Sequence, residues 1–161
     1  AARFSFNRSQ HSDLHTLREV NLIETHAAIR DDLGKLQQAS YAAAFIEQTT
    51  ETESPLPEIS QLMTDFLAWL CSHAAEPQNI LALELKLLRE LGMEPDIMET
   101  NLTPGAKKAT AALLESVWPD STRLKLSQAQ CKEISHWLQG FLVFNLGHLP
   151  RNRAAALAIP G

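Results

Sequence analysis

The segment Ile80–Leu91 reads ILALELKLLREL and is apolar on nearly every face of a helix. A helix at the protein surface carries apolar residues on one stripe only, whereas a helix that is apolar all round is enclosed by other elements. Pro77 suits the first turn of this helix, and Gly92 can adopt the left-handed conformation that often ends one. The segment therefore predicts a central helix against which the rest of the chain packs.

Apolar residues recur at helical spacing through most of the remaining chain. Upstream, this pattern predicts helices over Leu17 to Asp31, Asp32 to Thr49 and Glu58 to Ala74. Downstream, it predicts helices over Thr103 to Val117, Ser127 to Leu146 and Arg151 to Leu157. The expected fold class is all-α, a bundle of about six to seven helices.

The first residues follow a different pattern. From Ala2 to Asn7, apolar Phe4 and Phe6 alternate with polar residues, which is typical of a strand. No second strand pattern follows, and an isolated strand leaves its backbone groups unpaired. We therefore expect residues 1–15 to be the remnant of a preceding β domain with its linker, and residues 16–161 to form the helical domain.

Composition limits the classes of function. The formal net charge is −5, so the chain as a whole does not attract polyanions, and any contact with nucleic acid must come from a local basic patch. Cys71 and Cys131 lie within helical patterns and are interpreted as buried thiols of a reducing compartment. No apolar run approaches the roughly 18 residues that cross a membrane. These features predict a soluble, cytoplasmic protein with no membrane partner.

Arg151 and Arg153 are the principal candidate binding residues. They follow a Gly-x-x-Pro turn and lie near the start of the last short helix, where cations oppose the helix dipole and do not stabilise it. An exposed pair of arginines suits phosphate or carboxylate recognition; surface arginines without a binding role are the alternative. On the binding hypothesis, replacing both with alanine weakens DNA or partner binding with little loss of thermal stability.

The sequence offers no arrangement of catalytic residues. His11 and His15 have a spacing that binds zinc on a helix, but their segment has the composition of a polar connector and lacks an evident third ligand. A solvated turn is the favoured interpretation. We therefore predict no catalytic residue, no metal site and no cofactor.

Four stretches, taken in order and spacing, resemble the C-terminal helical domain of the recombination mediator RecO. They are Leu17–Glu24, Leu36–Phe45 with its Ala39-Ser40-Tyr41, Leu83–Gly92, and Phe141–Arg153. The resemblance implies that the N-terminal strand is the last strand of an OB-fold. Some relatives carry a four-cysteine zinc site after the Leu-Gly turn, but Met93–Asn101 contains no cysteine. The family's Lys-Ser-Arg corner reads Arg-Asn-Arg at residues 151–153.

The resemblance also implies a function, that of a non-enzymatic mediator of DNA repair and recombination in the bacterial cytoplasm, associated with the nucleoid. Its implied partners are single- and double-stranded DNA, RecR and the acidic tail of single-stranded DNA-binding protein. The residues assigned to DNA or partner contacts are Arg151, Arg153, Arg3 and Arg8, and those assigned to the tail are Lys86 and Arg89. The negative net charge predicts weak DNA binding by this chain alone.

Two other classes of function stay open. The first is a free-standing helical adaptor, unrelated to DNA, that binds a partner helix in an apolar groove. The second is a metal-dependent helical enzyme, which depends only on scattered histidines.

Overall fold

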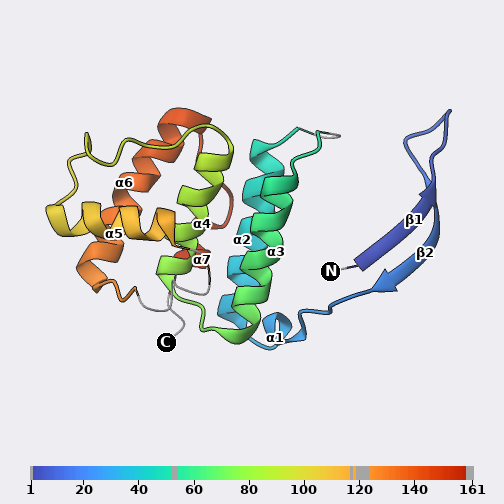
Figure 1. Ribbon diagram of the computed structural model, residues 1–161, viewed down its shortest axis with the longest axis horizontal. Coiled ribbons are helices and arrows are strands. Elements are labelled where there is room, and N and C mark those ends of the chain that lie inside the picture. The colour runs from blue at the N-terminus through green and yellow to red at the C-terminus, as the bar shows by residue number, and fades with distance from the viewer. Residues whose placement is uncertain (1, 52–53, 117, 119–123, 159–161) are drawn as a thin grey trace.

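The computed structural model describes residues 2–51, 54–116, 118 and 124–158. Over these residues it is mostly helical, with an antiparallel hairpin at the N-terminal end (Figure 1). The elements are β1 (Ala2–Asn7), β2 (Thr16–Leu22), α1 (Ala27–Arg30), α2 (Leu33–Thr49), α3 (Pro57–Ser72), α4 (Pro77–Glu90), α5 (Pro104–Glu115), α6 (Gln128–Leu146) and α7 (Arg153–Leu157). The expectation of a helical bundle is confirmed.

Helix α4 is the centre of the bundle. Its residues from Asn79 to Leu88 are all buried, and it packs against α2, α3, α5, α6 and α7. Pro77 occupies its first turn, and Gly92 beyond its end has a φ of 73°. The prediction made from the apolar segment Ile80–Leu91 is therefore confirmed, including the signals at both ends of the helix.

Local hydrogen bonds define the ends of the other long helices. The Asp32 carboxylate accepts from the backbone N–H of Lys35 at the start of α2, and Ser127 and Gln130 form a reciprocal capping box at the start of α6. Gly147, with φ 77°, ends α6. Helix α5 ends at Glu115; Val117, its predicted last residue, lies outside the described part of the chain.

The prediction for residues 17–22 is wrong, because this segment is a strand and not the start of a helix. Strand β2 pairs with β1, placing Phe4 opposite Val20 and Phe6 opposite Leu17. The register shifts between Ser5 and Phe6, where β2 carries one extra residue, Arg18. This bulge spaces the apolar residues of β2 irregularly, and the irregular spacing imitates helical periodicity. The first strand thus has its partner within the chain.

The hairpin is set apart from the helices and joined to them by the connection that leads into α1 (Figure 1). Every residue of β1 and β2 in the described structure is exposed, including the apolar face formed by Phe4, Phe6, Leu17, Val20 and Leu22. The hairpin continues to Leu22, beyond residue 15. The assignment of residues 1–15 to a preceding β domain stays a prediction. None of the described helices combines the length and apolarity that crossing a membrane requires.

Candidate functional site

The two candidate arginines of the C-terminal corner lie in different environments. Arg151 is exposed in the turn between α6 and α7, whereas Arg153, the first residue of α7, is only 5% exposed. The Arg153 guanidinium faces inward and binds the Glu84 carboxylate through both oxygens, from Nε to Oε1 at 2.7 Å and from Nη2 to Oε2 at 2.9 Å. The expectation of an exposed arginine pair is therefore wrong for Arg153.

Glu84 connects several helices through side chains that are buried together. Its Oε1 also accepts from the Tyr41 hydroxyl of α2 at 2.6 Å, and Arg153 donates in addition to the Ser135 carbonyl of α6 at 3.2 Å. Glu84 and Tyr41 are both fully buried. A buried carboxylate loses several kcal/mol of hydration, and only close, well-directed donors offset that loss. The network of Tyr41, Glu84 and Arg153 is therefore part of the core.

The ionisation of these groups reflects their mutual contacts. Burial, followed by the charge of Glu84, raises the pKa of Tyr41 far above its ordinary value, so its hydroxyl keeps the proton that it donates. Burial lowers the pKa of Arg153, but the hydrogen bonds and the charge of Glu84 outweigh burial and hold this pKa above its ordinary value. The arginine is thus held charged beside the carboxylate.

Lys86, assigned to tail binding by the resemblance, is also buried, at 5% exposure. Its Nζ donates to the carbonyl of Leu114 at 2.8 Å and to the carbonyl of Ser116, and it lies 5.9 Å from the centre of the Trp118 ring. These carbonyls end α5, whose last turn has no intrahelical donors. Lys86 therefore caps α5, and its ammonium faces the protein interior, so it is not available for the tail contact that the resemblance assigns to it.

Burial and, secondarily, the charge of Arg89 lower the pKa of Lys86 to about 8, against an opposing effect of Glu115. A neutral amine still carries two N–H groups, enough for both carbonyls. The cap therefore persists when the proton is lost.

Arg89 lies at the rim of a cleft between α3, α4 and the end of α5, with a volume of about 1160 Å³. Its side chain is 37% exposed, and Nη1 lies 3.7 Å from Oε1 of Glu115, which is itself largely in solvent. The apolar wall comes from Leu62, Trp69 and Trp118. The cleft thus combines an aromatic wall with one accessible cation, which is the combination that an aromatic-and-carboxylate ligand requires.

Two further features of the cleft bear on its ligands. The Trp69 indole Nε1 is buried and has no hydrogen-bond partner among the described residues, although its ring stacks on His73 at 3.4 Å between centroids. The lining also includes the acidic side chains of Glu58, Asp65, Glu90 and Glu115. Because Trp69 Nε1 is buried, it is not open to a ligand in the cleft, and a strongly acidic ligand is opposed by these carboxylates.

The remaining candidate residues are not gathered with Arg151. Arg3 is exposed in β1, opposite Asn21, and Arg8 follows the same strand. Figure 1 places the hairpin on one side of α2 and α3 and the α6–α7 corner on the other. Within the described residues, the arginines therefore do not form one continuous basic patch.

His11 and His15 lie in the connection between the strands and not on a helix. His15 stacks on Phe6 and accepts from the backbone N–H of Ser9 at 3.4 Å. The helical zinc spacing is therefore not realised by this pair.

We expect Arg153→Ala to lower the free energy of unfolding by about 3–5 kcal/mol, because it leaves the Glu84 carboxylate buried without its cation. Arg151→Ala, in the same turn, should change it by less than about 0.5 kcal/mol. Urea unfolding of both variants checks this. Removing both charges, in Glu84→Gln with Arg153→Met, should cost less than the sum of the single substitutions. Equal, small losses for the two arginines would show that the network contributes little.

The lowered pKa of Lys86 predicts a dependence of stability on pH. Between about pH 8 and pH 10.4 the unfolded chain binds the lysine proton more tightly than the folded chain does. The contribution of Lys86 to the free energy of unfolding should therefore rise with pH across this window. Unfolding curves of the wild type and Lys86→Met, recorded at several pH values, isolate this contribution because other groups titrate in both proteins. Parallel pH profiles would contradict it.

Comparison with known proteins relates part of the helical bundle to a family. Residues 30–103 match the family described as Recombination protein O C terminal. This segment includes α2, α3 and α4, and with them Tyr41, Glu84, Lys86 and Arg89. No solved structure matches the chain significantly.

Individual relatives agree with the family match. DNA repair protein RecO from a species of Anaeromyxobacter is 30% identical over 86 residues, covering 53% of this chain and 34% of the relative. The protein of the same name from Myxococcus xanthus is 33% identical over 87 residues, covering 54% and 36%. That from Bacillus pumilus is 29% identical over 84 residues, covering 52% and 33%. The match thus spans about a third of the length of these relatives. The chain carries a RecO C-terminal domain, and over about half its length it is a distant homologue of DNA repair protein RecO.

Proposed function

We propose that this chain is the helical part of a DNA recombination mediator, which acts by binding DNA and partner proteins without catalysis. The observation that carries this proposal is the family match over residues 30–103, because the same segment forms two walls of the cleft beside Arg89. RecR is proposed as a further partner from the resemblance alone, with no surface assigned to it.

For the cleft, we propose the tail of single-stranded DNA-binding protein as the ligand, with its acidic residues followed by an aromatic residue and a free carboxylate. The aromatic side chain packs against Leu62 and Trp69, and a carboxylate binds Arg89 in place of Glu115. This exchange is energetically small, since an exposed ion pair contributes about 0–1 kcal/mol. Lys86 stays with α5 and takes no part.

The acidic lining also supports a second candidate, a helical adaptor for a basic or amphipathic partner. Asp65 and Glu58 lie on α3 along the same cleft. They repel an acidic tail and attract a basic peptide. The two candidates therefore predict opposite effects of removing one of these charges.

Binding of a fluorescent tail peptide separates the two candidates. If the tail binds the cleft, Arg89→Ala should weaken binding about tenfold, corresponding to the loss of one charge-assisted contact, and Asp65→Asn should strengthen it. Arg151→Ala, which removes a cation outside the cleft, is the matched control. If the cleft instead serves a basic partner, the tail peptide fails to bind and a basic amphipathic peptide binds less well to Asp65→Asn.

DNA contact is proposed for the exposed Arg151, with Arg3 and Arg8 contributing from the hairpin. The net charge of −5 predicts weak binding that is lost as salt increases. We expect Arg151→Ala to weaken DNA binding and to reduce the slope of log affinity against log salt by about one. Fluorescence anisotropy with labelled single- and double-stranded DNA measures both quantities. Arg30→Ala, an exposed cation of α1 outside the proposed contact, should leave both unchanged, and an unchanged slope for Arg151→Ala removes it from the DNA contact.

A further inference from the structure

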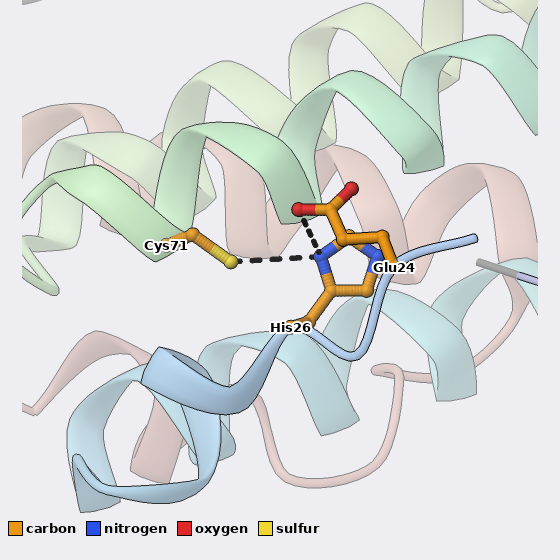
Figure 2. Close-up of side chains that lie close together, drawn as sticks. All are labelled: Glu24, His26 and Cys71. Atoms are coloured by element: carbon orange, nitrogen blue, oxygen red, sulfur yellow. Dashed lines mark hydrogen bonds and ion pairs between the residues drawn. The ribbon is translucent and has the colours of Figure 1, made fainter. Parts of the chain in front are cut away.

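Three side chains with different ligand atoms converge where the connection after β2 meets the end of α3. They are Glu24 and His26 from that connection and Cys71 from the last turn of α3 (Figure 2). The Cys71 Sγ lies 3.5 Å from Nδ1 of His26, and Oε1 of Glu24 lies 3.4 Å from the same nitrogen. Together they bring one sulfur, one nitrogen and one oxygen within 4.8 Å of one another.

The surrounding structure holds the imidazole in this position. His26 precedes α1 in the left-handed conformation, with φ 48°, and its side chain is 14% exposed. Cys71 is half-buried, and the Lys35 ammonium donates to its carbonyl at 3.3 Å, which fixes the end of α3 against α2. Glu24 is 48% exposed in its side chain. Two of the side chains are thus partly enclosed by the fold, and the third lies closer to solvent.

The separations agree with those around a tetrahedral zinc ion. With Zn–S about 2.3 Å and Zn–N and Zn–O about 2.0–2.2 Å, ligand atoms lie about 3.4 Å (N to O) and about 3.6 Å (N to S) apart. The observed values are 3.4 Å and 3.5 Å. The third pair, sulfur to carboxylate oxygen, lies within 4.8 Å. Tetrahedral zinc places such a pair about 3.6 Å apart, which is inside this limit.

The shared nitrogen does not fit a nucleophilic arrangement. In a cysteine–histidine–carboxylate arrangement, the thiol and the carboxylate bind opposite nitrogens of the ring, so that one orients the base that activates the other. Here both approach Nδ1. Ligand atoms of three side chains that lie this close together can be bridged by a cation. A set containing thiolate and imidazole suits zinc and not the oxygen-preferring magnesium or calcium.

We propose that Glu24, His26 and Cys71 form a zinc site with three protein ligands and a fourth position open to water or to a partner's side chain. It shares no residue with the cleft beside Arg89 and uses none of the segment Met93–Asn101. Bound zinc links the connection after the hairpin to the end of α3, and so restrains the hairpin relative to the bundle.

A metal titration of the whole chain tests the site. The protein is first freed of metal, and its cysteines are kept reduced. Zinc is added in competition with a chromophoric chelator, and cobalt is added separately to detect its charge-transfer band with thiolate. We expect one zinc per chain, a thiolate–cobalt band, and a more than about tenfold loss of affinity in Cys71→Ser and in His26→Asn. Asparagine is chosen because it tolerates the left-handed backbone of residue 26.

Matched controls lie on the same chain. Cys131→Ser removes the other thiol, and a double His11→Asn, His15→Asn variant removes the histidines of the hairpin connection. Both should bind zinc as the wild type does. Circular dichroism of metal-free Cys71→Ser establishes that the variant is folded before its affinity is compared. The proposal is overturned if the wild type binds no zinc, if Cys71→Ser binds it unchanged, or if the controls lose it equally.

Discussion

An ionised carboxylate in the interior of α4 is the constraint on which the helical bundle depends. Glu84 has no exposed surface, and its donors come from Tyr41 of α2 and Arg153 of α7. Helix α7 spans only Arg153–Leu157, too short to be stable in isolation. Its position is fixed because Arg153 reaches Glu84 and Ala156 is buried in the core. Helix α7 is thus attached to the bundle because its arginine completes the hydrogen bonds of one buried carboxylate.

The same buried carboxylate explains why three of the stretches that resemble the RecO family contain the residues that they do. Tyr41, Glu84 and Arg153 each lie in one of the stretches that carry it, and in space they form a single network. Within these stretches, the three buried residues therefore serve the fold and do not form a binding surface. Lys86 is a second case, since its ammonium caps α5. The accessible candidates for binding are the neighbours of these buried residues, Arg151 and Arg89.

Local patterns predicted what local interactions determine. The apolar run of α4, the starts of α2 and α6 beside Asp32 and Ser127, and Gly92 at positive φ are each decided within a few residues of sequence. The bulge in β2 was missed because it breaks the alternation that identifies a strand. The charge network was missed because Glu84 and Arg153 are 69 residues apart, although a buried acidic residue in an apolar helix needs hydrogen-bond or charge partners. Similarly, His26 and Cys71 are 45 residues apart, and no spacing rule joins them.

The end of α3 is where the two proposed sites approach each other. Trp69, in the wall of the cleft, and Cys71, in the proposed zinc site, are two residues apart, and successive helical residues turn by about 100°. They therefore project from roughly opposite sides of one helical turn. A ligand on one side affects the other only if the position of this turn differs between the free and bound states. The other two proposed zinc ligands, Glu24 and His26, lie in the connection that leads to the hairpin. The cleft, on its side, includes the ring stack of Trp69 and His73. Any coupling between the position of the hairpin and partner binding therefore passes through this turn, and it acts equally in both directions.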